Sequence, residues 1–409
     1  MNPTSMVQTR LFDGMRDAGV ERLRFKRTAE GFRMLAARKD GSWEPASSLL
    51  PDLTGDMDAV LALFRIGGHE RLDLVYRDEV GMRFLCAVHS TEQGPGAGGL
   101  RRHELSDPEI EVIQDLLNLA RAMTYKNKAA GLGRGGSKLC VHNPGIPDYA
   151  REQWLTCLAE EVDFSGTVTG PDTGYESSVY RELAERSFNV SGVRDGGTAR
   201  SAAVGVIEAL RATSAALGRP VGETRFAVQG LGRLGAHVAE ELAGAGASLV
   251  VTDKDHRRID ALVSSLTPET RERVQVCAPY QILGTEADVL VPCAVGGVIH
   301  GGIIRDLNVR AICGGANNQL QARSLDEELD LARDLMGGGI LFVPDWLASA
   351  GGAIHGVMEL TEGETFDVRH ALARIHRVCG WMVDEVLGEA RATGHAPLEI
   401  AVSRYLSSE

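Results

Sequence analysis

The chain has 409 residues, of which 44% are hydrophobic and 24% charged; this is an ordinary globular composition, and the length predicts about two domains. Lysine and arginine number 43 against 56 aspartates and glutamates, so the formal net charge of −13 disfavours nucleic acid or an anionic membrane as a partner. No stretch reaches the ~20 apolar residues of a membrane span, no secretory signal pattern opens the chain, and the seven cysteines are scattered without a CxxC pair. We therefore expect a cytoplasmic protein with reduced thiols and, since no metal-ligand spacing occurs, no metal.

The first 56 residues are interpreted as an N-terminal extension. Apolar periodicity predicts a helix and then a strand within residues 11–25. Pro45 and Pro51 predict a linker after them. Short patterns of the extension recur within residues 63–84, which is either a partial duplication or chance similarity, and the sequence leaves both readings open.

Mixed elements follow as far as residue 217. Apolar runs predict two strands joined by a short turn, at residues 72–76 and 82–88. A helix with one apolar face is expected over 107–125, and a glycine-rich loop over 131–138. Two further helices are expected, over 149–162 and 200–217.

From Arg225 onward, short apolar strands alternate with helices, which is typical of a doubly wound parallel sheet. Two helices are expected after the last strand, over 351–360 and 368–392. The predicted fold class is therefore α/β with two domains, the second a Rossmann dinucleotide-binding domain. Its six strands are expected at residues 226–228, 248–252, 274–276, 289–291, 311–313 and 340–343.

The first of these strands runs into the dinucleotide fingerprint G-x-G-x-x-G. Gly230 permits the tight turn, Gly232 lets the backbone approach a pyrophosphate, and Gly235 allows close packing of helix on strand. The helix that begins here offers free N–H groups to phosphates. Cofactor contacts are therefore assigned to the whole turn, Gly230, Leu231, Gly232, Arg233, Leu234 and Gly235.

Asp253 ends the next strand, at the spacing expected for the acid that binds a ribose diol. Its carboxylate favours NAD, because it would repel the 2′-phosphate of NADP. Lys254 is counted among the cofactor contacts, while Arg257 and Arg258 just beyond it keep NADP open as the alternative.

Two lysines and one aspartate form a second constellation. Lys126 and Lys138 flank the glycine-rich stretch, and Asp172 lies in the turn that begins at Thr169. A lone lysine is usually a solvated surface group. Beside a hydride cofactor, however, a 2-oxo or 2-amino acid needs a cation for its carboxylate, a cation or proton donor for its carbonyl, and a general acid/base for ammonia addition and water loss.

With these motifs, the sequence resembles the Glu/Leu/Phe/Val amino acid dehydrogenase family, and is closest to the phenylalanine and leucine dehydrogenase branch. The resemblance covers residues 57–392. It is carried, besides the fingerprint, by Gly94-Pro95-Gly96-Ala97-Gly98-Gly99, Met123-Thr124-Tyr125-Lys126, Gly135-Gly136-Ser137-Lys138, Gly170-Pro171-Asp172, Pro292-Cys293-Ala294-Val295-Gly296-Gly297, Gly315-Ala316-Asn317-Asn318, Pro344-Asp345 and Ala350-Gly351-Gly352.

The resemblance implies a role for each site residue. Lys126 would bind the substrate carboxylate, Lys138 would polarise the carbonyl and activate the attacking water, and Asp172 would carry protons to and from the departing nitrogen. Asn317 would help to fix the nicotinamide or the substrate. The other implied positions are Gly98 and Gly99 for the substrate, and Ser201, Cys293 and Ala294 for the cofactor.

The resemblance also implies the reaction and the organisation of the chain. The reaction is the reversible, NAD-dependent oxidative deamination of an L-amino acid to a 2-oxo acid and ammonium. We expect small-molecule partners only and a homo-oligomer. The expected division is an extension at 1–56, a substrate-binding and oligomerisation domain at 57–198 that is joined by 385–409, and an NAD-binding domain at 199–384.

Four positions that match the family's side-chain pocket are small, which predicts a bulky or aromatic substrate such as phenylalanine, tyrosine or tryptophan. A smaller side chain would leave unfilled space, at roughly 0.8 kcal/mol for each methylene. If the small residues instead serve packing, a branched-chain (leucine or valine) dehydrogenase remains open. The positions are Ala97, Gly170, Ala353 and Gly356.

Four residues depart from the family's pattern, and they leave a catalytically weakened NAD-binding protein, with a regulatory or interaction role, as the other alternative. One of them, Ala202, lacks the hydroxyl that the family has at this place, and the adjacent Ser201 can supply it. Because both lysines and Asp172 are intact, we expect an active enzyme. The departures are Leu100, Ser137, Tyr175 and Ala202.

Overall fold

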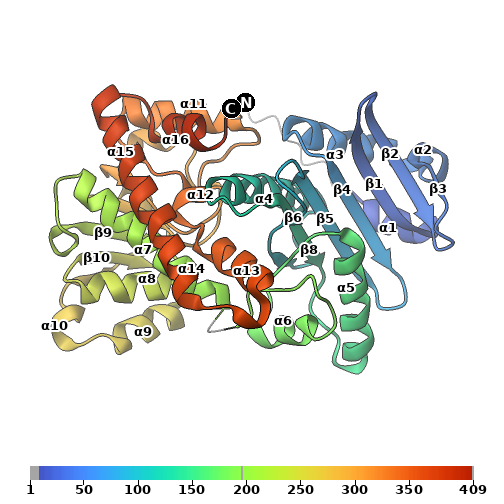
Figure 1. Ribbon diagram of the computed structural model, residues 1–409, viewed down its shortest axis with the longest axis horizontal. Coiled ribbons are helices and arrows are strands. Elements are labelled where there is room, and N and C mark those ends of the chain that lie inside the picture. The colour runs from blue at the N-terminus through green and yellow to red at the C-terminus, as the bar shows by residue number, and fades with distance from the viewer. Residues whose placement is uncertain (1–8, 195–196, 408–409) are drawn as a thin grey trace. The chain divides into compact units, whose positions relative to one another are not determined.

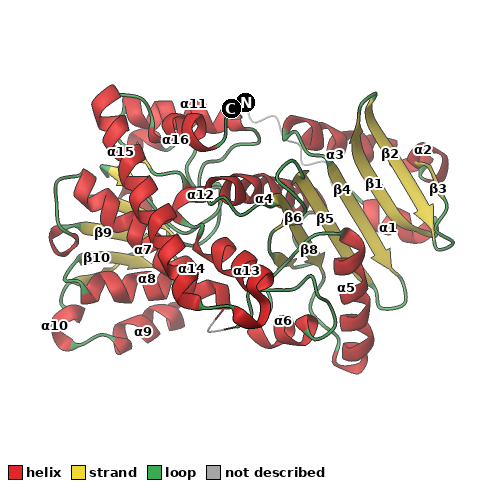
Figure 2. Ribbon diagram, in the orientation of Figure 1, coloured by secondary structure: helices red, strands yellow, loops and turns green. Residues whose placement is uncertain are grey.

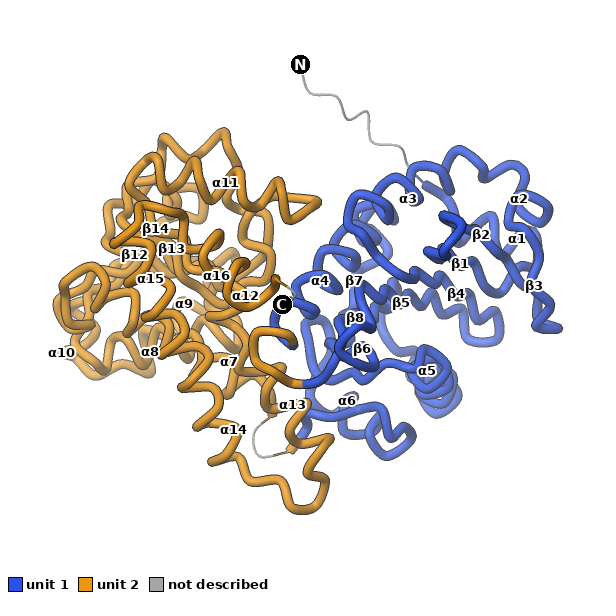
Figure 3. The backbone as a smooth tube through the Cα atoms, turned by 45° about the horizontal axis from the view of Figure 1, so that its top comes forward, with its two compact units in different colours: residues 1–127, 133–193 blue, residues 128–132, 194–409 orange. Residues whose placement is uncertain are grey.

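The structure is a computed structural model that describes residues 9–194 and 197–407 (Figure 1). The chain forms two compact units, coloured separately in Figure 3. Residues 1–127 and 133–193 make up the first unit, and residues 128–132 and 194–409 the second. Each unit contains one β-sheet with helices packed against it (Figure 2).

The first unit is built on an eight-stranded mixed sheet in the order β3-β2-β1-β4-β5-β8-β6, and β7 also pairs with β8. The pairs from β3 to β8 are antiparallel, whereas β6 and β7 run parallel to β8. The strands are β1 (Val20–Thr28), β2 (Gly31–Arg38), β3 (Trp43–Pro45), β4 (Arg71–Arg77), β5 (Met82–Ser90), β6 (Gly96–Ala97), β7 (Leu100–His103) and β8 (Gly135–His142).

Helices cover both faces of this sheet. Side chains of a strand alternate between its faces, so β4 buries Leu72 and Leu74 against α1, α3 and α4, and turns Val75 to the core that holds α5 and α6. The helices are α1 (Leu11–Asp17), α2 (Ala46–Leu49), α3 (Thr54–Ile66), α4 (Glu109–Ala129), α5 (Arg151–Ser165) and α6 (Ser177–Ala184).

The N-terminal segment is an integral part of the first unit. Strand β1 pairs with β4 in the middle of the sheet, and Arg22 on β1 donates two hydrogen bonds, of 2.8 and 2.7 Å, to the buried Glu161 of α5. The predicted linker is wrong, because its residues form α2 and the 3₁₀ turn η1 (Pro51–Leu53) that pack on the sheet. The order helix, strand, strand of α1-β1-β2 recurs in α3-β4-β5, and the two sets meet at the antiparallel β1–β4 pair, as a duplication would produce.

The second unit is built on a six-stranded sheet in the order β11-β10-β9-β12-β13-β14, with every pair parallel. This is the strand order of a Rossmann fold, whose direction of winding reverses between β9 and β12. All six predicted strands are confirmed: β9 (Arg225–Gln229), β10 (Ser248–Thr252), β11 (Val274–Val276), β12 (Val289–Pro292), β13 (Ala311–Ile312) and β14 (Leu341–Phe342).

The single helix predicted over 368–392 is interrupted by a π-helical segment, η7 (His376–Trp381), which separates α14 from α15. The remaining helices of the unit lie around the parallel sheet (Figure 1). The helices are α7 (Gly197–Ala216), α8 (Arg233–Gly244), α9 (His256–Ser265), α10 (Pro268–Arg271), α11 (Leu325–Gly337), α12 (Asp345–Ala348), α13 (Gly351–Glu362), α14 (Val368–Ile375), α15 (Met382–Thr393) and α16 (Pro397–Tyr405).

The C-terminal residues from 385 onward belong to the second unit, which corrects the expectation that they join the substrate domain. Helix α15 buries Val386 and Leu387 within this unit, where it contacts α7. Helix α16 is fastened to α11 by an ion pair of 2.7 Å between Arg333 and Glu399. In the part of the chain that the structure describes, no helix is long and apolar enough to cross a membrane.

Candidate active site

A buried lysine and a buried aspartate meet at the edge of the first unit's sheet. Lys138 lies in the middle of β8 and contacts the carboxylate of Asp172 directly, with 4% and 12% of their side chains exposed. Gly99 lies against both, since a Cβ built on it would be 3.0 Å from Lys138 Nζ and 3.1 Å from Asp172 Cβ. The predicted glycine-rich loop over 131–138 is therefore wrong in its second half, which is a fully buried strand.

The turn that carries Asp172 is fixed by hydrogen bonds of its backbone. Leu100 N–H donates to Gly170 O at 2.9 Å. The fully buried Tyr180 hydroxyl accepts from Asp172 N–H at 3.1 Å and donates to Leu100 O at 2.8 Å. The position of the carboxylate is therefore set by β7 on one side and by α6 on the other.

A second cation faces the same carboxylate. Arg101 Nη2 lies 3.5 Å from Asp172 Oδ1, and Arg101 Nη1 binds Asp115 Oδ2 of α4 at 2.8 Å. Burial acts to raise the pKa of Asp172, but the positive charges of Arg101 and Lys138 outweigh it and hold that pKa well below its usual range. The resting site thus contains an ionised carboxylate between two cations.

Lys126 lies on α4, which packs closely on this part of the sheet. Its side chain is buried, and the following residue, Asn127, donates hydrogen bonds to Ala97 O at 3.2 Å and Gly135 O at 2.6 Å. Met123, one turn before Lys126 on the same helix face, is 3.4 Å from a Cβ built on Gly98. Lys126 therefore projects from the helix face that is turned toward the Gly98–Gly99 turn.

The small residues near this pair have a packing reason. A Cβ on Gly98 would lie 1.7 Å from Ser137 O, and a Cβ on Gly170 would lie 2.4 Å from Ser191 O. Neither glycine can be replaced without a shift of the neighbouring backbone. Both residues are thus glycine because of close backbone packing. For Gly170 this supports the alternative that the small residue serves packing and does not widen a substrate pocket.

Three of the four departures from the family's pattern lie in the interior of the first unit, whereas Ala202 is half-buried on α7 of the second unit. Leu100 and Ser137 are fully buried. Tyr175 is 8% exposed and makes edge contacts with the rings of Trp154 and Tyr180. These three residues fill the core behind the turn that carries Asp172.

The fingerprint turn of the second unit has the geometry that a pyrophosphate needs. Gly230 adopts a φ of +92°, which favours glycine, and a Cβ on Gly235 would lie 1.9 Å from Gly230 O. The region around Gly232 is open, because the nearest atom to a Cβ there is Arg258 Nη1 at 3.7 Å. Gly232 is also the N-cap of α8 and carries no side chain, so the N–H groups of the first turn, from Arg233 and Leu234 on, are directed at this space.

Asp253 closes the same turn from the end of β10. Its carboxylate accepts from Leu231 N–H at 2.7 Å and from Asp255 N–H at 2.8 Å, and Arg258 Nη1 lies 3.6 Å away. Lys254 is exposed. These contacts hold the carboxylate beside the turn, where a ribose hydroxyl can reach its remaining lone pairs, so the residues present fit an adenine dinucleotide.

The other predicted cofactor residues lie at the carboxyl ends of the neighbouring strands. Ala294 approaches Gly230 so closely that a Cβ there would lie 3.0 Å from Ala294 Cα, and Cys293 is equally close to Gly235. The loop after β13 packs on the same loop, since Asn317 O would lie 2.5 Å from a Cβ on Gly296. In doubly wound sheets ligands bind at this point, where the strand order reverses.

Ser201 lies on α7 in a separate buried cluster. Its hydroxyl is 2.8 Å from His355 Nδ1, and His355 Nε2 is 3.3 Å from Glu359 Oε2. Ala353 and Gly356 lie on the half-buried side of the same helix, α13. Ser201 is thus committed to α13 in this structure, and Gly351 allows the close approach, since a Cβ there would be 2.1 Å from Ser201 O.

Sequence analysis missed Arg101, Asp115 and Tyr180. The signal for Arg101 is its position two residues after Gly99, because alternate residues leaving a turn in a strand point to the same face. Asp115 and Tyr180 give no such signal. Each is a single polar residue on a helix, and its partner comes from a distant part of the chain. Among the described residues, no three His, Cys, Asp or Glu side chains are grouped to hold a metal ion.

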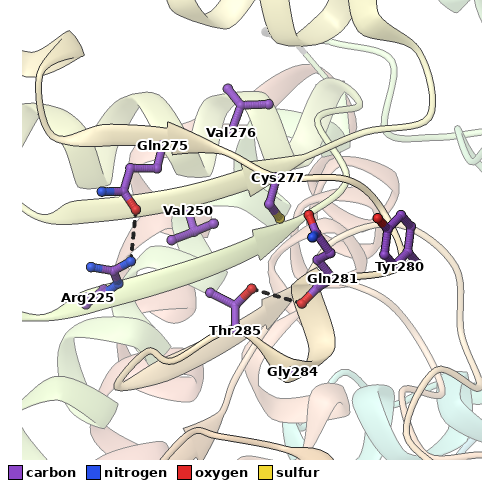
Figure 4. Close-up of a pocket in the computed structure, with 9 residues that line it drawn as sticks. All are labelled: Arg225, Val250, Gln275, Val276, Cys277, Tyr280, Gln281, Gly284 and Thr285. Carbon is purple, nitrogen blue, oxygen red and sulfur yellow. Dashed lines mark hydrogen bonds between the residues drawn. The ribbon is translucent and has the colours of Figure 1, made fainter.

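A surface pocket of about 540 Å³ lies elsewhere in the second unit (Figure 4). It opens at the β10–β11 edge of the parallel sheet, where Arg225 donates to Gln275 Oε1 at 3.0 Å. None of the predicted site residues lines it.

Fold and site together define a class of protein, an α/β dehydrogenase with a Rossmann unit and a second unit that holds a buried lysine–aspartate pair. Residues 249–402 match the family described as Glutamate/Leucine/Phenylalanine/Valine dehydrogenase, and residues 77–172 match the dimerisation domain of the same family. The chain belongs to this family and is therefore an oxidoreductase of the amino acid dehydrogenase type.

Individual relatives support the same assignment. The chain is 33% identical to phenylalanine dehydrogenase of Bacillus thermotolerans over 316 residues, which is 75% of this chain and 80% of that protein. It is 34% identical to valine dehydrogenase of Streptomyces albus over 334 residues, 78% of this chain and 87% of that one. The crystal structure of L-tryptophan dehydrogenase from Nostoc punctiforme matches with a TM-score of 0.62 and 25% identity, covering 84% of this chain and 96% of that chain.

Proposed function

We propose that the protein catalyses the reversible oxidative deamination of an L-amino acid: amino acid, NAD⁺ and water give the 2-oxo acid, ammonium, NADH and a proton. The observation that carries the proposal is the contact of Lys138 with Asp172, both buried against Gly99. A buried ion pair that included no reacting group would be a costly arrangement. Because Gly99 has no side chain, no Cβ covers the Lys138 ammonium and the Asp172 carboxylate on that side.

Each charged group has a task in this reaction. Lys126 binds the substrate carboxylate. Lys138 donates a hydrogen bond to the carbonyl oxygen of the 2-oxo acid and so stabilises the negative charge that develops there when ammonia adds. Asp172, which is ionised at rest, takes a proton from the nitrogen or the water and returns it. When bound, the nicotinamide accepts the hydrogen of the substrate α-carbon together with its electron pair.

The cofactor we propose is NAD. The support is the position of Asp253, whose carboxylate is held against the fingerprint turn by two backbone N–H groups. A carboxylate at this place binds a ribose diol and repels a 2′-phosphate. Arg258, 3.6 Å from that carboxylate, is the residue that favours NADP as the alternative.

For the substrate we propose a bulky, apolar amino acid, with phenylalanine, tyrosine and tryptophan ahead of leucine and valine. The support is the pair of small residues Ala353 and Gly356 on the half-buried side of α13, where the buried residues of that helix point elsewhere. The relatives include both phenylalanine and valine dehydrogenases at similar identity, so the branched-chain alternative is kept. We also propose a homo-oligomer, supported by the match to a dimerisation domain.

The test is an NADH absorbance screen over L-amino acids and, in reverse, over 2-oxo acids with ammonium. We expect activity with at least one aromatic amino acid, and its loss in Lys138→Ala. Lys26→Ala, which removes an exposed lysine of β1, serves as the matched control and should keep full activity. A wild-type chain that binds NADH but oxidises no amino acid would refute the proposal, and faster turnover of leucine than of phenylalanine and tryptophan would refute the aromatic preference.

A further inference from the structure

Asp172 is flanked by two cations, and the proposed reaction uses only one of them. Lys138 is given to the substrate oxygen, so it cannot remain a fixed partner of the carboxylate during turnover. Arg101 approaches Asp172 from β7, at 3.5 Å, and is assigned no role by the reaction. Thr173 N–H also donates to Asp172 Oδ1, at 2.7 Å, while the Tyr180 hydroxyl binds Asp172 N–H and Leu100 O.

The guanidinium of Arg101 is held in place from behind. Its Nη1 binds Asp115 at 2.8 Å, and the same carboxylate oxygen is 3.0 Å from His103 Nε2. His103 Nδ1 in turn is 3.2 Å from Asp107, whose side chain is 45% exposed. A continuous series of charged groups thus runs from the buried aspartate to the surface, within one compact unit.

We propose that Arg101 is a positioning residue, which keeps the Asp172 carboxylate ionised and oriented while Lys138 engages the substrate, and that Asp115 and His103 keep Arg101 in place. The proposal rests on the proposed function. It assigns to Arg101 no contact with substrate or cofactor, because its two terminal nitrogens are already directed at Asp172 and Asp115.

The chemistry of arginine suits this task. A guanidinium stays protonated throughout the pH range of enzymes, and its planar fork reaches two carboxylates at once. Burial acts to lower the pKa of Arg101, but the charges of Asp172 and Asp115 outweigh it and raise that pKa. A lysine in its place would offer one mobile ammonium. With Arg101 removed, burial of Asp172 would be opposed only by Lys138 and the Thr173 N–H among these groups, so the pKa of the carboxylate would rise.

The test compares Arg101→Gln with wild type in the full-length enzyme, by steady-state kinetics across pH 5.5 to 10. We expect kcat to fall by about tenfold or more while KM changes little, because the proton transfer is impaired and substrate binding is not. An acidic limb of kcat/KM governed by Asp172 should lie at higher pH in Arg101→Gln than in wild type, because the loss of an adjacent positive charge raises the pKa of that carboxylate. The solvent deuterium isotope effect on kcat should rise, and Arg101→Lys should restore part of the limb's position.

Arg102→Gln is the matched control on the same strand. Arg102 binds Gly174 O and Asn143 O and does not contact Asp172, so its loss loosens the same turn without changing the charge at the carboxylate. The acidic limb should stay where wild type has it. An equal shift in Arg102→Gln, or no shift in Arg101→Gln, would overturn the proposal.

A second variant keeps the test decisive if Arg101→Gln fails to fold. Asp115→Ala removes the carboxylate that holds Arg101 in place, so kcat should fall while KM changes little, and a wild-type kcat in this variant would contradict the proposal. Should wild type oxidise no amino acid, the proposed function fails, and the dependence of urea unfolding on pH between 4 and 6 still decides the inference. Arg101→Gln must then lose less stability than wild type on acidification, because its native Asp172 takes up a proton.

Discussion

Gly99 offers the most direct perturbation of the candidate site, because the smallest possible side chain at this position would touch both members of the Lys138–Asp172 pair. In Gly99→Ala the new Cβ would lie 3.0 Å from Lys138 Nζ, 3.1 Å from Asp172 Cβ and 3.2 Å from Asp172 Oδ2. These distances are a few tenths of an ångström below the 3.4 Å of an ordinary contact. The backbone can accept alanine, since the φ of Gly99 is not positive, so the strain falls on the two side chains.

The expected magnitudes follow from how far the pair must move. Overpacking of this size costs about 1 kcal/mol of stability, at the low end of the range for an added methyl group. Misplacement of a reacting group by 1 Å costs on the order of 100-fold in rate, so a displacement of a few tenths of an ångström predicts a loss of about tenfold in kcat. Activity should thus fall well beyond what the change in stability explains.

The assay is NADH formation with the best amino acid of the screen, alongside urea unfolding of the same preparation. Gly55→Ala is the matched control, since Gly55 is exposed on α3 and nothing lies within 4 Å of its Cβ. This variant should keep wild-type kinetics. If Gly99→Ala is as active as wild type, no reacting group lies at the Lys138–Asp172 contact, and the reasoning that places the chemistry there is refuted.

Three further predictions concern stability and cofactor choice. Glu161→Ala should cost about 3–5 kcal/mol in urea unfolding, because it leaves Arg22 and Arg77 without their buried partner, whereas loss of the exposed neighbour Glu160 should cost less than about 1 kcal/mol; equal losses would contradict the buried network. Burial lowers the pKa of His69 from 6.5 to about 4, so the unfolded chain takes up a proton first as pH falls below 6.5, and stability should drop by about 2 kcal/mol between pH 7 and 5. His69→Gln should remove the part of this loss that comes from His69, about 2 kcal/mol, while the buried His89, whose pKa is also lowered, keeps its own part; an unchanged dependence would show that His69 is accessible. Asp253→Ser should reduce the ratio of kcat/KM for NAD to that for NADP by about tenfold or more, as expected for the loss of a charged hydrogen-bond acceptor; an unaltered ratio would place the ribose elsewhere.

The parallel sheet could be predicted strand by strand, because its strands, apart from the exposed edge strand β11, are largely buried and therefore appear as short apolar runs. The strands of the first unit are harder to predict, because they are not uniformly apolar. Its strands β1 and β2 carry charged residues such as Arg22 and Arg24, which are paired with Glu161 and Asp73 from distant parts of the chain. Such partners leave no periodic signal, so the sequence predicts an extension where the chain forms β1, β2 and β3, three strands at one end of the sheet.

The same limit applies to the site. Lys126, Lys138 and Asp172 could be singled out because their neighbouring glycines are unusual in sequence, and the structure brings Lys138, Asp172 and Gly99 together. The predicted loop around Lys138 failed because its glycines permit close packing of α4 on a strand, with a Cβ on Gly136 only 2.1 Å from Thr124 Oγ1. Glycine therefore indicated close backbone approach correctly, but not whether the approach was to a ligand or to a helix.

The small residues assigned to the substrate pocket differ in what surrounds them. At Gly170 the space of a side chain is taken by Ser191 O, so this residue would be glycine whatever the substrate. Ala353 and Gly356, by contrast, are half-buried on α13, and neither is among the buried residues of that helix. Ala97 is buried in the sheet, so the proposed preference for a bulky substrate rests on the α13 pair. We therefore expect Gly356→Leu to lower kcat/KM for aromatic amino acids relative to kcat/KM for smaller ones. A larger residue at Gly170 should instead impair folding, and so lower activity with all substrates by the same factor.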